Sequence, residues 1–226
     1  MTSCEKANSL ISNFAENLKT KKNINSMGTI ITWEIKVKNT PLLKKKCSHC
    51  DSDRFYCSDK FRMNAQKKSI DVWLIYRCVQ CDNTCNLTLL SRKRTDLIDK
   101  ALFHSFSVND TETAWKYAFS SELERQNNAT FDFNSVDYEI VSSTSPEELL
   151  TMTDEFISIR IKCNFEFSIK LPLLLRKFFS LSSRQIKQVL EQDIISIPTS
   201  GSLQKYKVRD GDVISINIRR LMEGSK

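Results

Sequence analysis

Two Cys-x-x-Cys pairs are the residues whose types and spacing best fit a chemical role. The pairs are Cys47–Cys50 and Cys78–Cys81, separated by the 27 residues 51–77. Thiolates presented in pairs on two tight turns are a usual ligand set for one tetrahedral zinc ion. We therefore expect a structural Zn²⁺ held by Cys47, Cys50, Cys78 and Cys81. The alternatives for these residues are two disulfides or four buried thiols.

A zinc ion held by four thiolates is structural rather than catalytic, because no coordination position remains for a catalytic water. The sequence also lacks a glycine-rich phosphate loop, an HExxH pair and a nucleophile elbow. Only two histidines are available as general bases. We therefore expect no enzymatic activity and no small-molecule substrate, with an RNA-modifying enzyme as the alternative.

The remaining cysteines have no spacing that indicates a role. Cys57 and Cys85 lie in strand-like stretches close to the two turns, and a four-ligand site does not need them, so we expect half-buried strand residues. Cys4 and Cys163 stand alone in the sequence. His49 lies inside the first turn and is expected to face solvent.

The composition is that of a globular chain in a reducing compartment. Of 226 residues 40% are hydrophobic, and only 4 Gly and 4 Pro are present, which argues against a flexible linker. No apolar window of about 18 residues exists, and the N-terminus lacks the apolar core of a secretory signal. Eight cysteines in such a chain indicate metal binding rather than disulfides. We expect one or two domains and a small module, in the cytoplasm, with no membrane partner.

The net charge of +7 is unevenly distributed along the chain. Residues 36–94 carry 14 basic and 5 acidic residues (+9), and residues 168–226 carry 11 and 5 (+6). Residues 95–167 between them carry 5 and 14 (−9). Basic regions often bind phosphate. The alternative is that the basic ends pack against the acidic middle.

The elements that must position the four cysteines are strands. Thr29–Lys38 alternates apolar and polar residues, and Arg54–Cys57, Asp71–Arg77 and Thr84–Leu90 flank the two turns. Ser58–Ser69 is polar and basic and is expected to be a loop. Together these stretches predict a zinc ribbon.

Helices are expected in the middle of the chain. Trp115 and Phe119 are spaced i, i+4 on an apolar stripe, which favours core packing over base stacking. The expected elements are helices over Asp96–Phe106, Glu112–Gln126 and Pro146–Leu150, short strands within Phe131–Val141, and a strand over Phe156–Phe167.

The C-terminal segment has two helical patterns, Leu171–Phe179 and Ser183–Gln192, followed by strands at Ile194–Ile197 and Val213–Ile218. Its serine–arginine turn and the closing motif Lys207–Ile214 (KVRDGDVI) resemble the S4 RNA-binding domain. The resemblance covers about 50 residues and implies recognition of structured RNA. The alternative is a ubiquitin-like or other small α+β module.

Candidate RNA contacts follow from charge and from helix termini. A helix that begins at Ser182, Ser183 and Arg184 offers backbone N–H groups, hydroxyls and a guanidinium to a phosphate. Further cations near that helix are Lys170, Arg176 and Lys187. In the expected basic loop of the ribbon the candidates are Lys60, Arg62, Lys67 and Lys68.

Several motifs occur together in the N-terminal half: Trp33-Glu34, the first cysteine pair, Phe55–Lys68, Asp71–Tyr76, the second cysteine pair, and Ala114–Ala118. In this combination the chain resembles an uncharacterised bacterial family catalogued as domain of unknown function 1062. The resemblance runs from Trp33 to the C-terminus. It implies a bacterial origin and little about activity.

The predicted fold class is α+β, with an antiparallel zinc ribbon, a helical and mixed middle region, and a small S4-like lobe. By composition the chain divides into an N-terminal extension (1–28) with a short helix over Ser9–Lys19, a zinc ribbon (29–94), an acidic middle region (95–167) and the S4-like lobe (168–226). The predicted function is the binding of structured RNA, such as ribosomal RNA, tRNA or a ribosomal particle. The alternative is a protein–protein adaptor or a DNA-binding regulator built on the ribbon.

Overall fold

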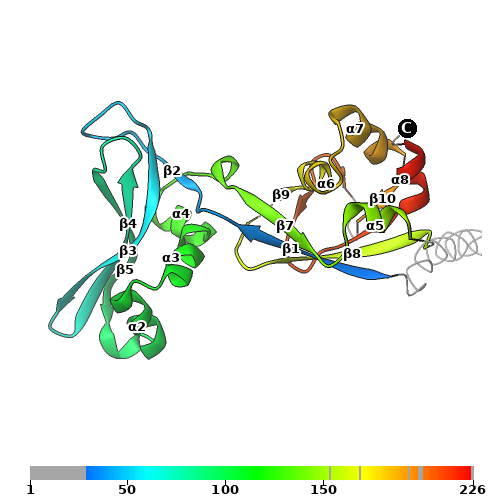
Figure 1. Ribbon diagram of the computed structural model, residues 1–226. Helices are drawn as coiled ribbons and strands as arrows, with labels where there is room; N and C mark the ends of the chain where they lie inside the picture. The colour runs from blue at the N-terminus through cyan, green and yellow to red at the C-terminus, as the bar shows by residue number, and fades with distance from the viewer. Residues whose placement is uncertain (1–28, 153, 168, 193, 198–200, 225–226) are drawn as a thin grey trace, which may run out of the picture.

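The computed structural model describes residues 29–152, 154–167, 169–192, 194–197 and 201–224. The expected N-terminal extension, with its short helix, lies outside these ranges. The described residues form three β-sheets and seven α-helices, which confirms the α+β class. Figure 1 shows two lobes side by side, each built on a five-stranded sheet.

The first lobe, called the cysteine lobe below, contains an antiparallel sheet in the order β5-β4-β3-β2-β6. Buried and accessible side chains alternate along its long strands, so one face of the sheet is buried. This confirms the strands expected beside the cysteine turns. The strands are β2 (Leu42–Lys44), β3 (Arg54–Gln66), β4 (Ser69–Cys78), β5 (Thr84–Arg94) and β6 (Phe131–Asp132).

The prediction of a loop over Ser58–Ser69 is wrong. β3 continues to Gln66 and pairs with β4 across a turn at Lys67, whose φ is 54°. The register shifts between Cys57 and Lys60, which marks a β-bulge. An extra residue at a bulge breaks the alternation of apolar and polar residues, so the strand pattern is hidden in the sequence at this point.

Three short helices cover the buried face of this sheet (Figure 1). The side chains of Asp99, Asp110 and Ser120 each cap the start of one helix by accepting backbone N–H groups. Because Ser120 starts a new helix, the single helix expected over Glu112–Gln126 is in fact two. The elements are the 3-10 turn η2 (Thr95–Leu97), α2 (Lys100–Val108), α3 (Thr111–Ala118) and α4 (Ser121–Asn127).

The second lobe contains a mixed sheet in the order β10-β12-β8-β1-β7. β1 and β8 are parallel, and the other pairs are antiparallel. The strands are β1 (Ile30–Val37), β7 (Tyr138–Ser142), β8 (Phe156–Cys163), β10 (Ile195–Ser196) and β12 (Val213–Asn217). A separate two-stranded sheet pairs β9 (Ile169–Lys170) with β11 (Lys207–Val208).

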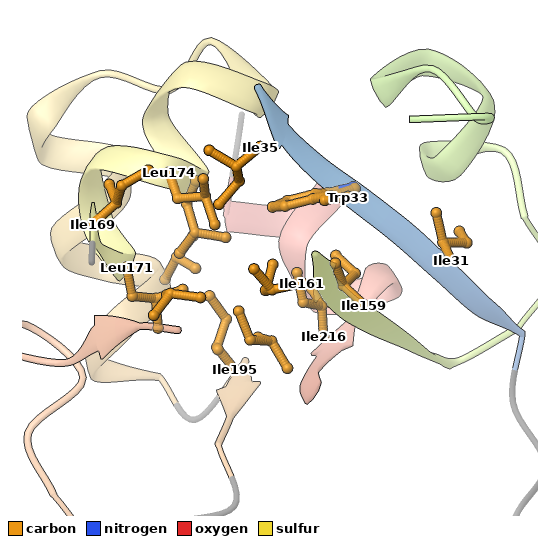
Figure 2. Close-up of a cluster of buried hydrophobic side chains, with 14 of the residues drawn as sticks. Ile31, Trp33, Ile35, Ile159, Ile161, Ile169, Leu171, Leu174, Ile195 and Ile216 are labelled. Carbon is orange, nitrogen blue, oxygen red and sulfur yellow. The ribbon is translucent and has the colours of Figure 1, made fainter. Parts of the chain in front are cut away.

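The core of the second lobe lies between its sheet and the helices above it (Figure 2). Trp33 on β1 is fully buried, and its ring lies 4.1 Å from that of Phe178, centroid to centroid. Isoleucines from β1, β8, β10 and β12 supply most of the rest of the sheet side. The helices are α5 (Pro146–Leu150), α6 (Leu171–Phe179), α7 (Ser183–Glu191) and α8 (Ile218–Gly224).

The cysteine lobe is an insertion between two neighbouring strands of the second lobe. β1 precedes it and β7 follows it, and the two strands pair directly, with Val37 opposite Tyr138. At the junction, Lys38 N donates to Asp137 O at 2.7 Å and Asp137 N donates to the Asn39 side chain at 2.8 Å. The second-lobe sheet therefore draws strands from residues 29–94, from 95–167 and from 168–226.

An aromatic cluster connects the two lobes. Phe119, which follows α3, is buried and stacks on Phe165 with centroids 5.1 Å apart. Trp115 packs against both hydrophobic cores, and its indole N–H donates to the Asp59 carboxylate at 3.1 Å. Phe119 is a buried core residue and Trp115 packs half-buried against both cores, so both favour core packing as their spacing predicted.

Candidate metal centre

The sulfur atoms of the two cysteine pairs meet at one end of the cysteine lobe. The four Sγ atoms of Cys47, Cys50, Cys78 and Cys81 all lie within 4.8 Å of one another. The Sγ atoms of Cys47 and Cys81 are 3.6 Å apart, and those of Cys50 and Cys78 are 3.5 Å apart. Four sulfurs at about 2.3 Å from a tetrahedral zinc lie about 3.8 Å from one another. The cluster can therefore hold a metal ion.

The distances exclude disulfide bonds between the sulfurs, which would require about 2.05 Å. All seven cysteines in the described part of the chain are free thiols. Of the alternatives set by the sequence, two disulfides are therefore not formed in this structure.

Backbone hydrogen bonds shape each cysteine turn. Cys47 N donates to Ser52 O at 2.8 Å, which closes the first turn, and Cys78 N donates to Asn83 O at 2.9 Å, which closes the second. The N–H of His49 points at the Cys47 sulfur, with an N···S distance of 3.4 Å. An N–H directed at a sulfur favours the thiolate, the form that binds metal.

The thiols of the cluster differ in pKa. Burial acts to raise the pKa of Cys78, but hydrogen bonds from the N–H groups of Gln80 and Cys81 outweigh it and lower the pKa to about 6. The N–H of Ser52 acts to lower the pKa of Cys50, but burial and the neighbouring sulfurs raise it to about 12. Thiolates crowded together repel one another, and a bound cation relieves that repulsion.

The cluster lies at the surface of the lobe. Cys47 and Cys78 are buried, Cys50 is half-buried and Cys81 is exposed. His49 is exposed, as expected. In the described ranges no other set of three or more cysteine, histidine or acidic residues is arranged for a metal.

Cys57 and Cys85 are strand residues outside the cluster, as predicted, but both are buried, at 8% exposure, rather than half-buried. The ammonium of Lys45 lies 3.3 Å from the Cys85 sulfur. Burial raises the pKa of Cys57 to about 12, so this thiol stays protonated at neutral pH.

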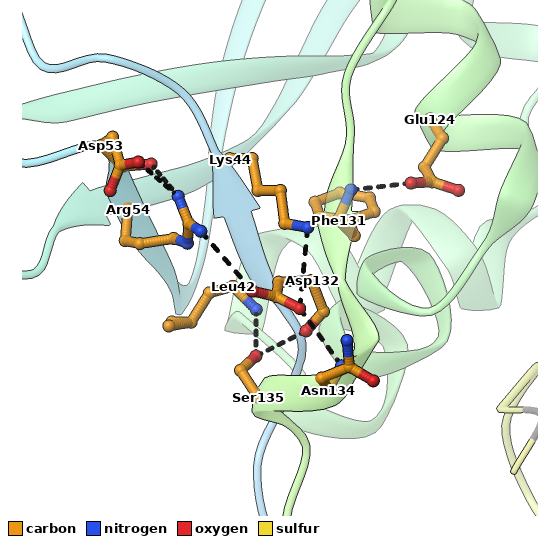
Figure 3. Close-up of polar contacts among 9 residues, drawn as sticks. All are labelled: Leu42, Lys44, Asp53, Arg54, Glu124, Phe131, Asp132, Asn134 and Ser135. Carbon is orange, nitrogen blue, oxygen red and sulfur yellow. Dashed lines mark hydrogen bonds and ion pairs between the residues drawn. The ribbon is translucent and has the colours of Figure 1, made fainter.

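A polar network fixes the strands beneath the first cysteine turn (Figure 3). Arg54 Nη1 lies 2.7 Å from the Asp53 carboxylate, and its Nη2 lies 3.7 Å from Asp132. Lys44 Nζ lies 3.8 Å from the same Asp132 carboxylate. Ser135 Oγ accepts from Leu42 N at 3.0 Å. The network links β2, β3 and β6, so it holds the start of the cysteine turn against the sheet.

The basic residues predicted in the cysteine lobe are spread along the β3–β4 hairpin, away from the cysteine end. Lys60 and Arg62 are exposed on β3, and Lys67 and Lys68 form the turn at the far end of the hairpin. Nine residues of β4 separate that turn from Cys78, a distance of roughly 30 Å at about 3.4 Å per residue. The cysteine cluster and the hairpin tip are thus at opposite ends of the same strands.

The basic residues predicted in the second lobe lie around α6 and α7, on the other lobe (Figure 1). Ser182 caps α7: its hydroxyl accepts from Gln185 N at 3.3 Å, and its N–H donates to the Gln185 side chain at 2.9 Å. Lys187 lies 3.8 Å from Glu191. The structure does not bring the two predicted basic groups together. The exposed members of this second group are Lys170, Arg176, Ser182, Ser183, Arg184 and Lys187.

Sequence reasoning missed a row of residues on the outer face of the cysteine-lobe sheet. Tyr56, Trp73 and Arg77 lie on this face, beside Lys60 and Arg62. Part of this row could have been read from the sequence, because the alternation in β4 places Trp73 and Arg77 on the face of the sheet away from the buried residues. The bulge in β3 concealed that Lys60 and Arg62 share their face.

Comparison with protein families gives one match. The model of a family described as "Protein of unknown function (DUF1062)" matches residues 63–200, more than half of the chain. The match begins inside β3 and so includes the second cysteine pair but not the first. Comparison with curated proteins gives no match, and comparison with solved structures gives none.

Within the residues that the structure describes, no helix is long and apolar enough to cross a membrane.

Proposed function

The chain belongs to the DUF1062 family of proteins of unknown function, and from this premise we propose that it is a non-catalytic zinc-ribbon protein that binds structured RNA. The expected partners are ribosomal RNA, tRNA or a ribosomal particle. In this proposal zinc fixes the cysteine turns, and basic residues on both lobes contact phosphates.

The observation that carries the proposal is a set of cations without acidic partners. Lys60, Arg62 and Arg77 are exposed on neighbouring strands. Among the described residues, none of them forms an ion pair with a carboxylate, and neither do Lys67 and Lys68 at the hairpin tip. Unpaired cations gathered on one surface attract a polyanion, and the phosphate backbone of a nucleic acid is such a polyanion.

Zinc is the metal that best fits the cysteine cluster. Four thiolates in a tetrahedral arrangement select zinc or an iron–sulfur centre over the harder metals that prefer oxygen ligands. Two Cys-x-x-Cys turns at the end of an antiparallel hairpin favour zinc in a structural role. With four sulfur ligands present, this site would supply folding energy and no reactive water.

The arrangement of the second lobe supports an S4-like reading of its C-terminal half. α6 and α7 are followed by β10 and β12, as expected, and by the strand β11 between them, which was not predicted. Gly211 has a φ of 82° in the turn before β12, which explains the glycine in the Asp-Gly-Asp motif. Asp212 closes this turn by accepting from Arg209 N and from the Tyr206 hydroxyl, each at 2.8 Å. Exposed Ser183 and Arg184 at the start of α7 are then available to a phosphate.

The proposal is tested by binding to ribosomal RNA fragments and tRNA at graded salt, with duplex DNA as competitor. We expect micromolar affinity at low salt that falls steeply as salt rises. Lys60→Ala lowers the slope of log K against log salt by about 1. Lys116→Ala is the matched control, because Lys116 already pairs with Glu112 at 2.9 Å. Absence of RNA binding at low salt would contradict the proposal. If duplex DNA displaces the RNA at lower concentration than unlabelled RNA does, the chain is a DNA-binding regulator instead.

A further inference from the structure

The outer face of the cysteine-lobe sheet is left open by the helices. The hydrophobic cluster that α2, α3 and α4 share with the sheet contains Val72, Leu74 and Tyr76 of β4. The alternate residues of β4 therefore point away from these helices. In Figure 1 the three helices lie on one side of this sheet, and the opposite side faces away from the second lobe.

Two aromatic rings stand on this open face. Tyr56 on β3 is 37% exposed, and Trp73 on β4 is half-buried. Their places are fixed by register, because Tyr56 pairs with Arg77 and Trp73 pairs with Arg62. Directly paired residues of an antiparallel sheet lie on the same face, so each ring has a cationic neighbour.

Positive charge lies between and beside the rings. Lys60, between them on β3, is paired with Ile75, and it has no described ion-pair partner, like Arg62 and Arg77. The two carboxylates at the ends of this face are engaged: Asp71 accepts from Arg92 N at 2.8 Å, and Asp82 accepts from the Tyr56 hydroxyl at 2.8 Å. The centre of the face is therefore both aromatic and cationic.

We propose that this face binds an unpaired segment of RNA, with bases stacked on Tyr56 and Trp73 and phosphates held by Lys60, Arg62 and Arg77. Bases stack on aromatic side chains whatever their sequence, and cations follow the phosphate backbone. The inference rests on the proposed function and narrows it from structured RNA in general to a single-stranded loop, bulge or end.

The two rings are too far apart to be reached by neighbouring stacked bases. Trp73 and Arg77, the partner of Tyr56, are four positions apart on β4, which is about 13 Å at 3.3 Å per residue. Stacked bases repeat at about 3.4 Å along a strand. Two neighbouring bases that stay stacked on each other therefore cannot each cover one ring, and bases inside a duplex already have both faces covered by their neighbours.

The metal centre is connected to this face through one hydrogen bond. Asp82 follows the ligand Cys81 in the second cysteine turn and holds the Tyr56 hydroxyl. Its N–H donates to Cys78 O at 3.1 Å, so the turn fixes its position. The metal would thus position one of the two stacking rings without contacting RNA.

The test uses the full chain and a fluorescein-labelled, 12-nucleotide RNA without self-complementarity, both alone and annealed to its complement. Fluorescence anisotropy should show tighter binding of the single strand. Tyr56→Ala and Trp73→Ala should each weaken it about tenfold or more, with the salt slope unchanged. Trp73→Phe, which restores a ring, should recover most of the affinity. Phe103→Ala is the control, because Phe103 is a similarly exposed ring, 39%, on the helix side of the lobe.

Each outcome decides the inference. If the chain binds duplex and single strand equally, and the alanine variants bind as the wild type does, the stacking face is wrong while RNA binding stands. If no RNA binds at low salt, the proposed function itself has failed. Where an alanine variant does not fold, 4-thiouridine crosslinking of the wild type decides: crosslinks on peptides containing Tyr56 or Trp73 support the face, and crosslinks confined to the second lobe overturn it.

Discussion

At the scale of single residues, the four cysteines were predictable because their role depends on local spacing. A Cys-x-x-Cys turn places two sulfurs together without help from the rest of the fold. The structure adds that both turns meet and that Cys57 and Cys85 do not join them. The aromatic residues of the outer face were not predictable in the same way, because their grouping depends on register between strands.

Replacing a cysteine of the cluster tests the metal. We expect Cys50→Ser to remove most of the bound zinc and to unfold the cysteine lobe, because a site with three thiolates loses both affinity and a cross-link between the turns. Elemental analysis of the purified chain and circular dichroism measure the two effects. Cys57→Ala, also a buried thiol in this lobe, is the control and should keep one zinc per chain. A Cys50→Ser chain that folds and binds zinc like the wild type would contradict the metal site.

Asp110 gives the cysteine lobe an acid-sensitive helix start. Hydrogen bonds from the Thr113 hydroxyl and N–H hold the pKa of Asp110 below its usual value. A carboxyl whose pKa is lowered by folding stabilises the fold above its unfolded pKa of about 3.9, and this stabilisation is lost as pH falls through the folded pKa. We expect Asp110→Asn to keep the helix cap but to flatten the loss of stability below about pH 4. Thermal melts of both chains from pH 6 to pH 3 measure it, and parallel curves would refute it.

At the scale of elements, regular alternation made β1, β4 and β8 readable, and helical periodicity made α6 and α7 readable. The prediction for β3 was wrong where a bulge shifts the alternation of buried and exposed residues. The prediction of one helix after Asp110 was wrong because Ser120 caps a second helix. Both failures have the same cause. A one-residue change of phase is decided by tertiary pairing or by a cap, and a pattern averaged over a window passes over it.

At the start of α7, the capping role of Ser182 can be tested separately from the proposed RNA contact of Arg184. We expect Ser182→Ala to lower the free energy of unfolding of the second lobe by about 1 kcal/mol, because the N-cap acceptor is lost. Ser182→Asp restores the acceptor and should recover that stability. The same aspartate adds negative charge beside Arg184, so it should weaken RNA binding where a phosphate docks there. Urea unfolding and RNA titration on the same three chains measure both effects. Equal stability of the alanine and wild-type chains would show that the cap contributes nothing.

At the scale of the whole molecule, the segments marked out by composition do not coincide with the two lobes formed by the sheets. Local composition reports charge and periodicity along the chain, but it carries no record that β1 pairs with β7 and β8 across a large insertion. Nothing within residues 29–94 indicates that its first strand belongs to the other lobe. Pairing between distant strands is therefore the part of the fold that single-sequence reasoning could not supply.

The insertion predicts that the cysteine lobe can be removed. Lys38 and Asp137 are hydrogen-bonded neighbours at the junction, so a short glycine–asparagine turn can join them. We expect the shortened chain to keep a cooperative thermal transition and its parallel β1–β8 pairing. Its midpoint should be lower than that of the full chain, because the buried ring of Phe119 is lost from the second core. Calorimetry and amide exchange measure this, and a chain without protected amides in β1 would show that the second lobe depends on the insertion.

The parallel pairing of β1 with β8 also sets an order of events during synthesis. β1 ends at Val37 and β8 begins at Phe156, so at about 5–20 residues per second the ribosome adds the partner strand roughly 6–24 seconds later. All strands and helices of the cysteine lobe emerge within that interval. The nascent chain can therefore fold the cysteine lobe before β1 meets β8, and the apolar side of β1 stays uncovered until α6, which carries Phe178, has also been made.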